Sequence, residues 1–195
     1  MWYINAPKLV LDDNPGMWVT SRDAMRRAYL STSKPDVTKY FIGGAGVTHV
    51  VMFQRRHIKA FDDRVHGFLP NEYYLAMMQR LRLAHTNAHF YLLSMSKMSQ
   101  PCGVNVNGEY TLCDEQFEDF KGIPNLTMLL DLPLADSFHI MVSADILVDS
   151  MSSFSYAAAV LTLGQVYHHG GYHGLVPGHL QPFPLDLARN CVSRS

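Results

Sequence analysis

The segment 144–159, which reads ADILVDSMSSFSYAAA, holds the residues with the clearest chemical potential. Its apolar residues at 146–148 predict a short buried strand over 145–149, and the serines after it predict a turn that opens a helix of small residues. The first turn of a helix has unpaired N–H groups and a partial positive charge, and serine hydroxyls add further donors. This pattern predicts a phosphate-binding turn made by Ser150, Ser152, Ser153 and the N–H groups around Phe154. The alternative interpretation is a serine helix cap with no ligand.

A basic turn follows another apolar run. The run is VTHVVMF at 47–53, and Arg55, Arg56 and His57 come directly after it. Guanidinium groups make paired hydrogen bonds to phosphate oxygens. The carboxyl ends of parallel strands meet at one edge of a sheet, so we expect this turn to lie on the same edge as the serines. A solvent-exposed basic turn without a ligand is the alternative.

Two carboxylates are predicted at the same edge. Asp131 ends the apolar run LTMLLD, and Asp136 stands near the start of the helix that follows. A carboxylate there would accept a hydrogen bond from a sugar or ribose hydroxyl, or act as a base. The alternative for Asp136 is a helix N-cap. We interpret His139 as a packing residue inside that helix.

Four histidines gather near the end of the chain, at 168, 169, 173 and 179. Their spacing fits no standard zinc pattern, and no carboxylate lies between the first and the last, so we expect no metal. A metal-dependent enzyme built on them is kept as a third hypothesis. The sequence also lacks the glycine-rich phosphate loops GxxxxGK[ST] and GxGxxG and the hydrolase motif GxSxG.

The composition is that of a globular domain, with 195 residues, 48% of them hydrophobic and 17% charged. A formal net charge of −1 argues against nucleic acid as the main partner, because no basic excess meets a phosphate backbone. Cys102, Cys113 and Cys191 are an odd set without CxxC spacing, so only a single Cys102–Cys113 bridge stays open. No long apolar stretch near the N-terminus predicts a signal peptide or a membrane anchor.

The elements that position these residues alternate along the chain. Strands are predicted at 47–53, 89–94, 126–131, 145–149 and 165–168. Helices are predicted at 20–30, 72–84, 114–121 and 154–163, with a further short helix capped near Asp136. Thr20 or Ser21 is expected to cap the first helix, and 99–107 is expected to be a loop. Alternating strands and helices predict an α/β fold, a Rossmann-like parallel sheet with helices on both faces.

Apolar spacing within two of these helices predicts which faces are buried. The helix at 72–84 is expected to bury Tyr74, Met77, Met78 and Leu81. The helix near 136 is expected to bury Leu134, Phe138, Met141 and Val142. The expected organisation is an N-terminal extension at 1–46, a Rossmann-like donor-binding domain at 47–170 and an irregular tail at 171–195.

The order of these motifs resembles that of the GDP-fucosyltransferase-like glycosyltransferases, the superfamily of the nodulation-type α-1,6 and the α-1,2 enzymes. The resemblance is carried by the basic turn after a strand, FLPNEYYL at 68–75, ADSFH at 135–139 and the segment 144–155. It runs from about residue 47 to residue 170, is clearest over 131–159, and is strongest toward algal and protist relatives.

The resemblance implies the donor-binding half of a GT-B-type enzyme that transfers a sugar, with inversion, from GDP-fucose to a glycan hydroxyl. No metal or other cofactor is implied. Arg55, Arg56 and Asp136 would serve catalysis, the arginines by neutralising the diphosphate. Ser150, Ser152, Ser153, Phe154 and Asp131 would contact the donor. The implied location is the Golgi lumen for a eukaryotic chain that is part of a longer anchored protein, and the cytoplasm otherwise.

The sequence departs from the family in its first motif, His-x-Arg-Arg-x-Asp. Aligned on the end of the strand, residues 52–57 read MFQRRH, which lacks the leading histidine and the first arginine. Shifted by one residue, 53–58 read FQRRHI, which keeps both arginines and lacks the histidine and the aspartate. The comparison with the family implies that an acceptor-binding half is mostly missing, unless 1–46 is its remnant. The alternative function is therefore a catalytically inactive structural or carbohydrate-binding module of the same fold.

Overall fold

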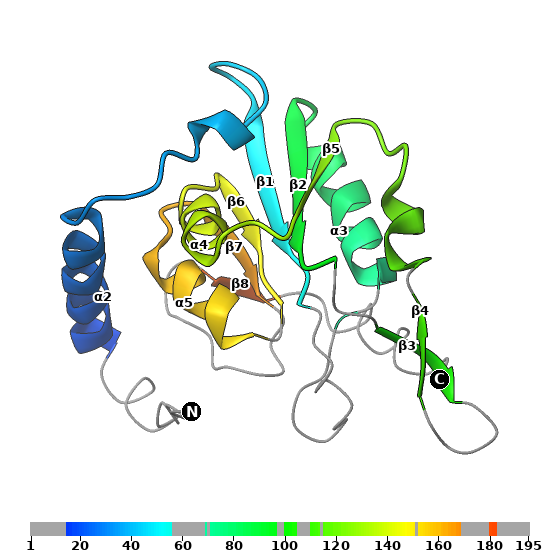
Figure 1. The fold of residues 1–195 in the computed structure, drawn as a ribbon. Coiled ribbons are helices and arrows are strands. Elements are labelled where there is room, and N and C mark those ends of the chain that lie inside the picture. Colours follow the sequence, from blue (N-terminus) through cyan, green and yellow to red (C-terminus); the bar gives the residue numbers. More distant parts are fainter. Residues whose placement is uncertain are drawn as a thin grey trace.

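A six-stranded sheet, parallel at every pairing, lies at the centre of the structure (Figure 1). Its strands are β1 (Thr48–Phe53), β2 (Ala88–Ser94), β5 (Leu126–Leu130), β6 (Ile146–Val148), β7 (Gln165–His168) and β8 (Leu180–Pro182). The computed structural model describes residues 15–55, 69, 71–96, 100–104, 110–113, 115–150, 152–168 and 180–182.

The order of the strands is that of a Rossmann sheet. Across the sheet the strands run β5-β2-β1-β6-β7-β8. When the six strands of this sheet are numbered in chain order, this is 3-2-1-4-5-6, the order of doubly wound dinucleotide-binding folds. The predicted Rossmann-like α/β fold is confirmed. Strand β8 was not predicted. It lies in the tail at 171–195, which was expected to be irregular.

Helices cover both faces of the sheet. Helix α3 (Asn71–Ala84) and the 3-10 helix η3 (Glu115–Phe120) pack on one face, and α4 (Leu134–Val142) and α5 (Ser153–Leu161) pack on the other. The central strand β1 supplies both cores, with Val50 and Met52 in the first and Val51 in the second. This double burial explains why its sequence is a continuous apolar run.

The predicted buried face is confirmed for α3 but only in part for α4. In α3 the predicted apolar residues are all buried, as the spacing indicated. In α4, Met141 and Val142 are buried, but Leu134 is 71% exposed. The prediction for Leu134 was wrong because α4 begins at Leu134 itself, with Pro133 at the N-cap position. Asp136 is therefore a first-turn residue and not the cap.

The chain before β1 packs on the face that α4 and α5 cover. Helix α2 (Pro15–Leu30) begins five residues before the predicted start, so Thr20 and Ser21 lie inside it and do not cap it. The Tyr29 hydroxyl lies 2.8 Å from Nδ1 of His139 on α4. After the short 3-10 helix η1 (Thr38–Tyr40), Phe41 packs edge-on against Tyr91 of β2. The extension is thus tied to the sheet.

Residues 99–107, predicted to be a loop, contain a strand. Strand β3 (Gln100–Val104) pairs antiparallel with β4 (Tyr110–Cys113), and the register shifts between Pro101 and Gly103. This hairpin connects β2 to η3 in place of a helix. The side chains of the three cysteines lie outside the described part of the structure, so a Cys102–Cys113 bridge stays a prediction.

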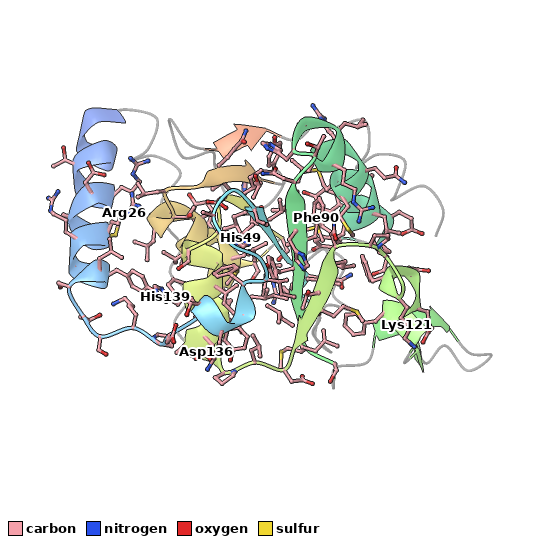
Figure 2. All side chains as sticks on the ribbon, turned by 90° about the horizontal axis from the view of Figure 1, so that it is seen from above. Arg26, His49, Phe90, Lys121, Asp136 and His139 are labelled. Atoms are coloured by element: carbon pink, nitrogen blue, oxygen red, sulfur yellow. The ribbon has the colours of Figure 1, made fainter. Side chains whose placement is uncertain are left out.

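Two histidines lie side by side at the amino ends of the strands. His49 of β1 and His89 of β2 are register partners, and Figure 2 looks onto this edge, with His49 over the middle of the sheet. His89 Nε2 lies 2.8 Å from the Thr127 hydroxyl, and His49 Nδ1 lies 3.1 Å from the Tyr91 hydroxyl. Burial lowers the pKa of His89, and the neighbouring His49 lowers it further.

Gly164 stands where no side chain fits. A Cβ atom there would lie 2.2 Å from the carbonyl oxygen of Ala144 and 2.6 Å from that of Asp145. We expect Gly164→Ala to lower the free energy of unfolding by about 2–3 kcal/mol, because the backbone before β6 must move. Gly44→Ala is the control, since nothing lies within 4 Å of its Cβ position. Equal stability of the two variants in urea unfolding would show that the backbone around Gly164 adjusts without cost.

The lowered pKa of His89 makes stability depend on pH. A histidine kept neutral by the folded state binds a proton more readily in the unfolded state, so stability falls as the pH drops below about 6.5. We expect the thermal midpoint of the wild-type protein to fall between pH 7 and pH 5. His89→Gln, which keeps a donor near Thr127, should fall less steeply; the same slope in both proteins would rule out this role for His89.

Candidate functional site

The carboxyl ends of β1 and β6 lie side by side where the strand order reverses. Met52 of β1 is the register partner of Val148 of β6, and the two strands are neighbours in the sheet. Ligands of open α/β sheets bind outside the carboxyl ends of the strands at such a switch point. The residues that leave these two strands are Gln54 and Arg55 after β1 and Asp149 and Ser150 after β6. We take this edge as the candidate site.

The serine turn is built by hydrogen bonds among its own residues. Ser152 has extended backbone, and its Oγ accepts from the N–H of Phe154 at 3.3 Å. The Ser155 hydroxyl lies 3.3 Å from the carbonyl oxygen of Ser150 and 3.1 Å from that of Ser152. The predicted serine cap is confirmed, and α5 begins at Ser153, so Ser153 and Phe154 form its first turn.

One hydroxyl of this turn is buried without a partner. The residue is Ser150, 2% exposed, and its Oγ has no hydrogen-bond partner within the described part of the chain. Leaving a buried hydroxyl unsatisfied costs about 1–3 kcal/mol. Ser150 lies between the end of β6 and the start of α5, and its backbone N–H and carbonyl oxygen both lie 3.3 Å from the Ser155 hydroxyl in that helix. An oxygen-bearing ligand at that helix terminus would give the Ser150 hydroxyl a partner.

A buried carboxylate and a buried histidine lie beside the turn. Asp149 Oδ2 is 2.7 Å from His168 Nδ1, and the two side chains are 0% and 1% exposed. The N–H of Asp149 also donates to the carbonyl oxygen of Tyr167 at 3.1 Å, so the pair joins the ends of β6 and β7. Burial raises the pKa of Tyr73 and of Tyr156, and the charge of Asp149 adds to this in both.

Sequence reasoning missed this pair. The sequence pattern marks Asp149 only as the last residue of a strand, and His168 only as one member of the histidine cluster. The available signal was that two short strands, ILV at 146–148 and QVY at 165–167, are followed directly by Asp149 and His168. In a parallel sheet such residues meet at the carboxyl edge when their strands are neighbours.

Gln54, the residue before Arg55, is held in place by hydrogen bonds. Gln54 is buried, its N–H donates to the carbonyl oxygen of Leu93 at 2.9 Å, and its side-chain amide donates to Asn71 Oδ1 at 2.7 Å. The Ser94 hydroxyl donates to the carbonyl oxygen of Gln54 at 2.9 Å. Arg55, partly exposed, follows this anchored residue at the end of β1. Arg56 lies outside the described residues.

The predicted carboxylates lie away from the switch point. Asp131 follows β5, two strands from β1, and its carboxylate accepts from the N–H of Ser96 at 3.0 Å and from the Ser96 hydroxyl. Asp136 Oδ2 accepts from the Tyr40 hydroxyl at 2.7 Å and lies 3.8 Å from Lys39 Nζ. Figure 2 shows Asp136 beside η1. Of the predicted site residues, those that follow the carboxyl ends of the neighbouring strands β1 and β6 are Arg55, Ser150, Ser152, Ser153 and Phe154.

Within the described residues, no three histidine, cysteine, aspartate or glutamate side chains are grouped so that they could hold a metal ion. Of the four histidines near the end of the chain, only His168 is described, and it contacts Asp149. His169, His173 and His179 lie outside the described residues, so the hypothesis of a metal site built on them stays open.

The comparisons with known proteins add no assignment. No model of a known protein family matches the sequence, and no curated protein matches it. In the described part of the chain, no helix combines the length and the apolar character needed to cross a membrane. The resemblance to fucosyltransferases therefore stays a prediction, and the functional assignment depends on the geometry of the switch point.

The Ser152 cap offers a test of the turn. We expect Ser152→Ala to lower the free energy of unfolding by about 1 kcal/mol, because the N–H of Phe154 loses its acceptor. Ser152→Thr keeps a capping hydroxyl and should recover most of the loss. Denaturant unfolding of the three proteins measures both effects, and an alanine variant as stable as the wild-type protein would show that the cap contributes nothing.

Proposed function

We propose that the chain binds a nucleotide sugar, with GDP-fucose as the first candidate, and transfers the sugar to a glycan hydroxyl. The observation that carries the proposal is the buried, unpartnered hydroxyl of Ser150 at the start of α5, at the switch point of a Rossmann-ordered sheet, within the described part of the chain. The donor class and the reaction come from the resemblance to GDP-fucosyltransferase-like enzymes.

Two kinds of group would bind the diphosphate. The first turn of α5 and the hydroxyl of Ser150 supply neutral donors and the partial positive charge of a helix terminus. Arg55, which leaves β1 on the neighbouring strand, supplies a full positive charge. Groups fixed in place before the reaction stabilise charge that develops on a leaving diphosphate without having to reorganise.

A catalytically inactive carbohydrate-binding or structural module is the second candidate, and one observation favours it. Asp136, the carboxylate expected to serve catalysis, accepts a hydrogen bond from Tyr40 and lies near Lys39. Asp131 is held by Ser96 in the same manner. A module of this kind predicts no sugar transfer and weak or absent binding of GDP.

Arg55→Ala is the test of the diphosphate site. We expect it to weaken GDP binding about 10- to 100-fold, since a hydrogen bond from a charged group contributes about 1.5–3 kcal/mol. Calorimetric titration with GDP, and with UDP and ADP for selectivity, measures the effect. Arg80→Ala is the matched control: it removes the same charge from an exposed position on α3.

The outcomes separate the two candidates. Selective GDP binding that is lost in Arg55→Ala and kept in Arg80→Ala supports the donor site, and release of sugar from GDP-fucose to an acceptor glycan then decides for the enzyme. If the wild-type protein binds none of the three nucleotides, the proposed donor site is wrong. Binding without transfer favours the inactive module.

A further inference from the structure

Strand β5 is an end strand of the sheet (Figure 1), and within the described residues it pairs with β2 alone. Both of its faces are covered, because Leu126 and Met128 pack against one core and Leu129 packs against the other. All five residues of β5 are nevertheless only half-buried, whereas the centre of β1 is fully buried. The exposed part of β5 is therefore its outer edge.

Two hydrogen bonds show which residues of this segment face β2. The carbonyl oxygen of Asn125 accepts from the N–H of Phe90 at 2.8 Å. The N–H of Asp131 donates to the carbonyl oxygen of Ser94 at 3.0 Å. The direction of the backbone groups alternates along a strand, so the odd-numbered residues between 125 and 131 direct their N–H and C=O groups toward β2.

The even-numbered residues Leu126, Met128 and Leu130 therefore direct their N–H and C=O groups to the outer edge. Within the described part of the chain, none of these backbone groups has a hydrogen-bond partner. Edge strands that avoid further pairing usually contain a charged residue or a proline, and the sequence of β5, LTMLL, contains neither. By contrast, β8 at the opposite end of the sheet order has three residues and ends in a proline.

The outer edge of β5 is symmetric about Met128. Asn125 and Asp131 have left-handed backbone, with φ of 56° and 55°, and each stands three residues from Met128. A second β5, antiparallel and related by a two-fold axis at Met128, would pair Met128 with Met128 and Leu126 with Leu130. Every outward N–H group would then meet an outward C=O group. A register shifted by two residues would leave Leu126 or Leu130 of each copy without a partner.

The charges at the two ends of β5 favour the same antiparallel arrangement. Arg82 donates a hydrogen bond to the carbonyl oxygen of Pro124, just before the strand, and Asp131 directly follows the strand. Antiparallel pairing brings the amino end of one β5 beside the carboxyl end of the other. The positive end of each copy would then lie next to the negative end of its partner, and opposite charges across paired strands stabilise the pairing.

We propose that the outer edge of β5 binds a second copy of this chain. The two β5 strands pair antiparallel about a two-fold axis at Met128, and the two sheets join into one. The occupant is a second copy because the outward groups of β5 complement themselves in this register. The inference does not depend on the proposed function, since β2 separates β5 from β1 and the candidate site lies at the ends of β1 and β6.

Sedimentation velocity of the full chain over a range of concentrations measures the association. A strand pair of this length forms a small interface, so we expect a dimer at roughly 100 μM that dissociates on dilution to about 1 μM. A protein that stays monomeric over this range would overturn the proposal.

Met128→Pro is the variant that tests the axis. Its missing N–H is one that faces outward, and a proline is tolerated in an edge strand at such a position, so the ladder to β2 is kept. We expect dimerisation at least about tenfold weaker, because both hydrogen bonds at the two-fold axis are lost. Met128→Ala is the matched control: it loses the same side-chain packing but keeps the N–H, and should still dimerise. Thermal unfolding shows whether both variants fold.

Amide hydrogen exchange of the wild-type protein tests the register without a variant. In the dilute protein, the amides of Leu126, Met128 and Leu130 should exchange fast, while those of Thr127 and Leu129 are protected by β2. At high concentration we expect all five to be protected. A dimer whose outward amides still exchange fast, or that persists in folded Met128→Pro, uses another surface and contradicts the proposal. Protection of these amides in the monomer would also contradict it, because the edge would then be covered by the chain itself.

Discussion

The burial of β1 on both faces and both edges is the constraint on which the rest of the structure depends. Val50, Val51 and Met52 are all fully buried, and β1 pairs with β2 on one side and β6 on the other. A strand with no exposed edge fixes the position of both halves of the sheet. Because the chain reverses direction across the sheet at this strand, its pairing with β6 also creates the switch point at which the candidate site lies.

The sequence predicts most of the sheet because its parallel strands are buried on both faces. Runs such as VTHVVMF are apolar for that reason, and they need no knowledge of their partners to be recognised. What sequence reasoning missed lacks this signal. Strand β8 is the tripeptide LQP, which contains a proline, and it is a strand only because β7 provides a ladder for it. The start of α4 was misplaced because an aspartate was weighed above the proline that precedes the helix.

In the candidate site too, the contacts between residues close in sequence could be predicted and the long-range contacts could not. The serine cap of α5 could be predicted because its donor and acceptor are two residues apart. The contact between Asp149 and His168 spans 19 residues, and that between Tyr40 and Asp136 spans 96, so neither follows from local spacing. Both depend on the strand order, which places some carboxylates at the switch point and others against the N-terminal extension.

Asp149 has two effects that conflict. It joins the ends of β6 and β7 through its backbone and its carboxylate, and so holds the serine turn in place. Its charge would also oppose an anion bound at the serine turn, which the proposed function requires. An amide at this position would remove the repulsion, but it would have to turn its oxygen toward Nδ1 to accept the same hydrogen bond. The contact with His168 therefore fixes the end of β6 against the end of β7, and a ligand at the proposed anion site would have to bind beside this carboxylate.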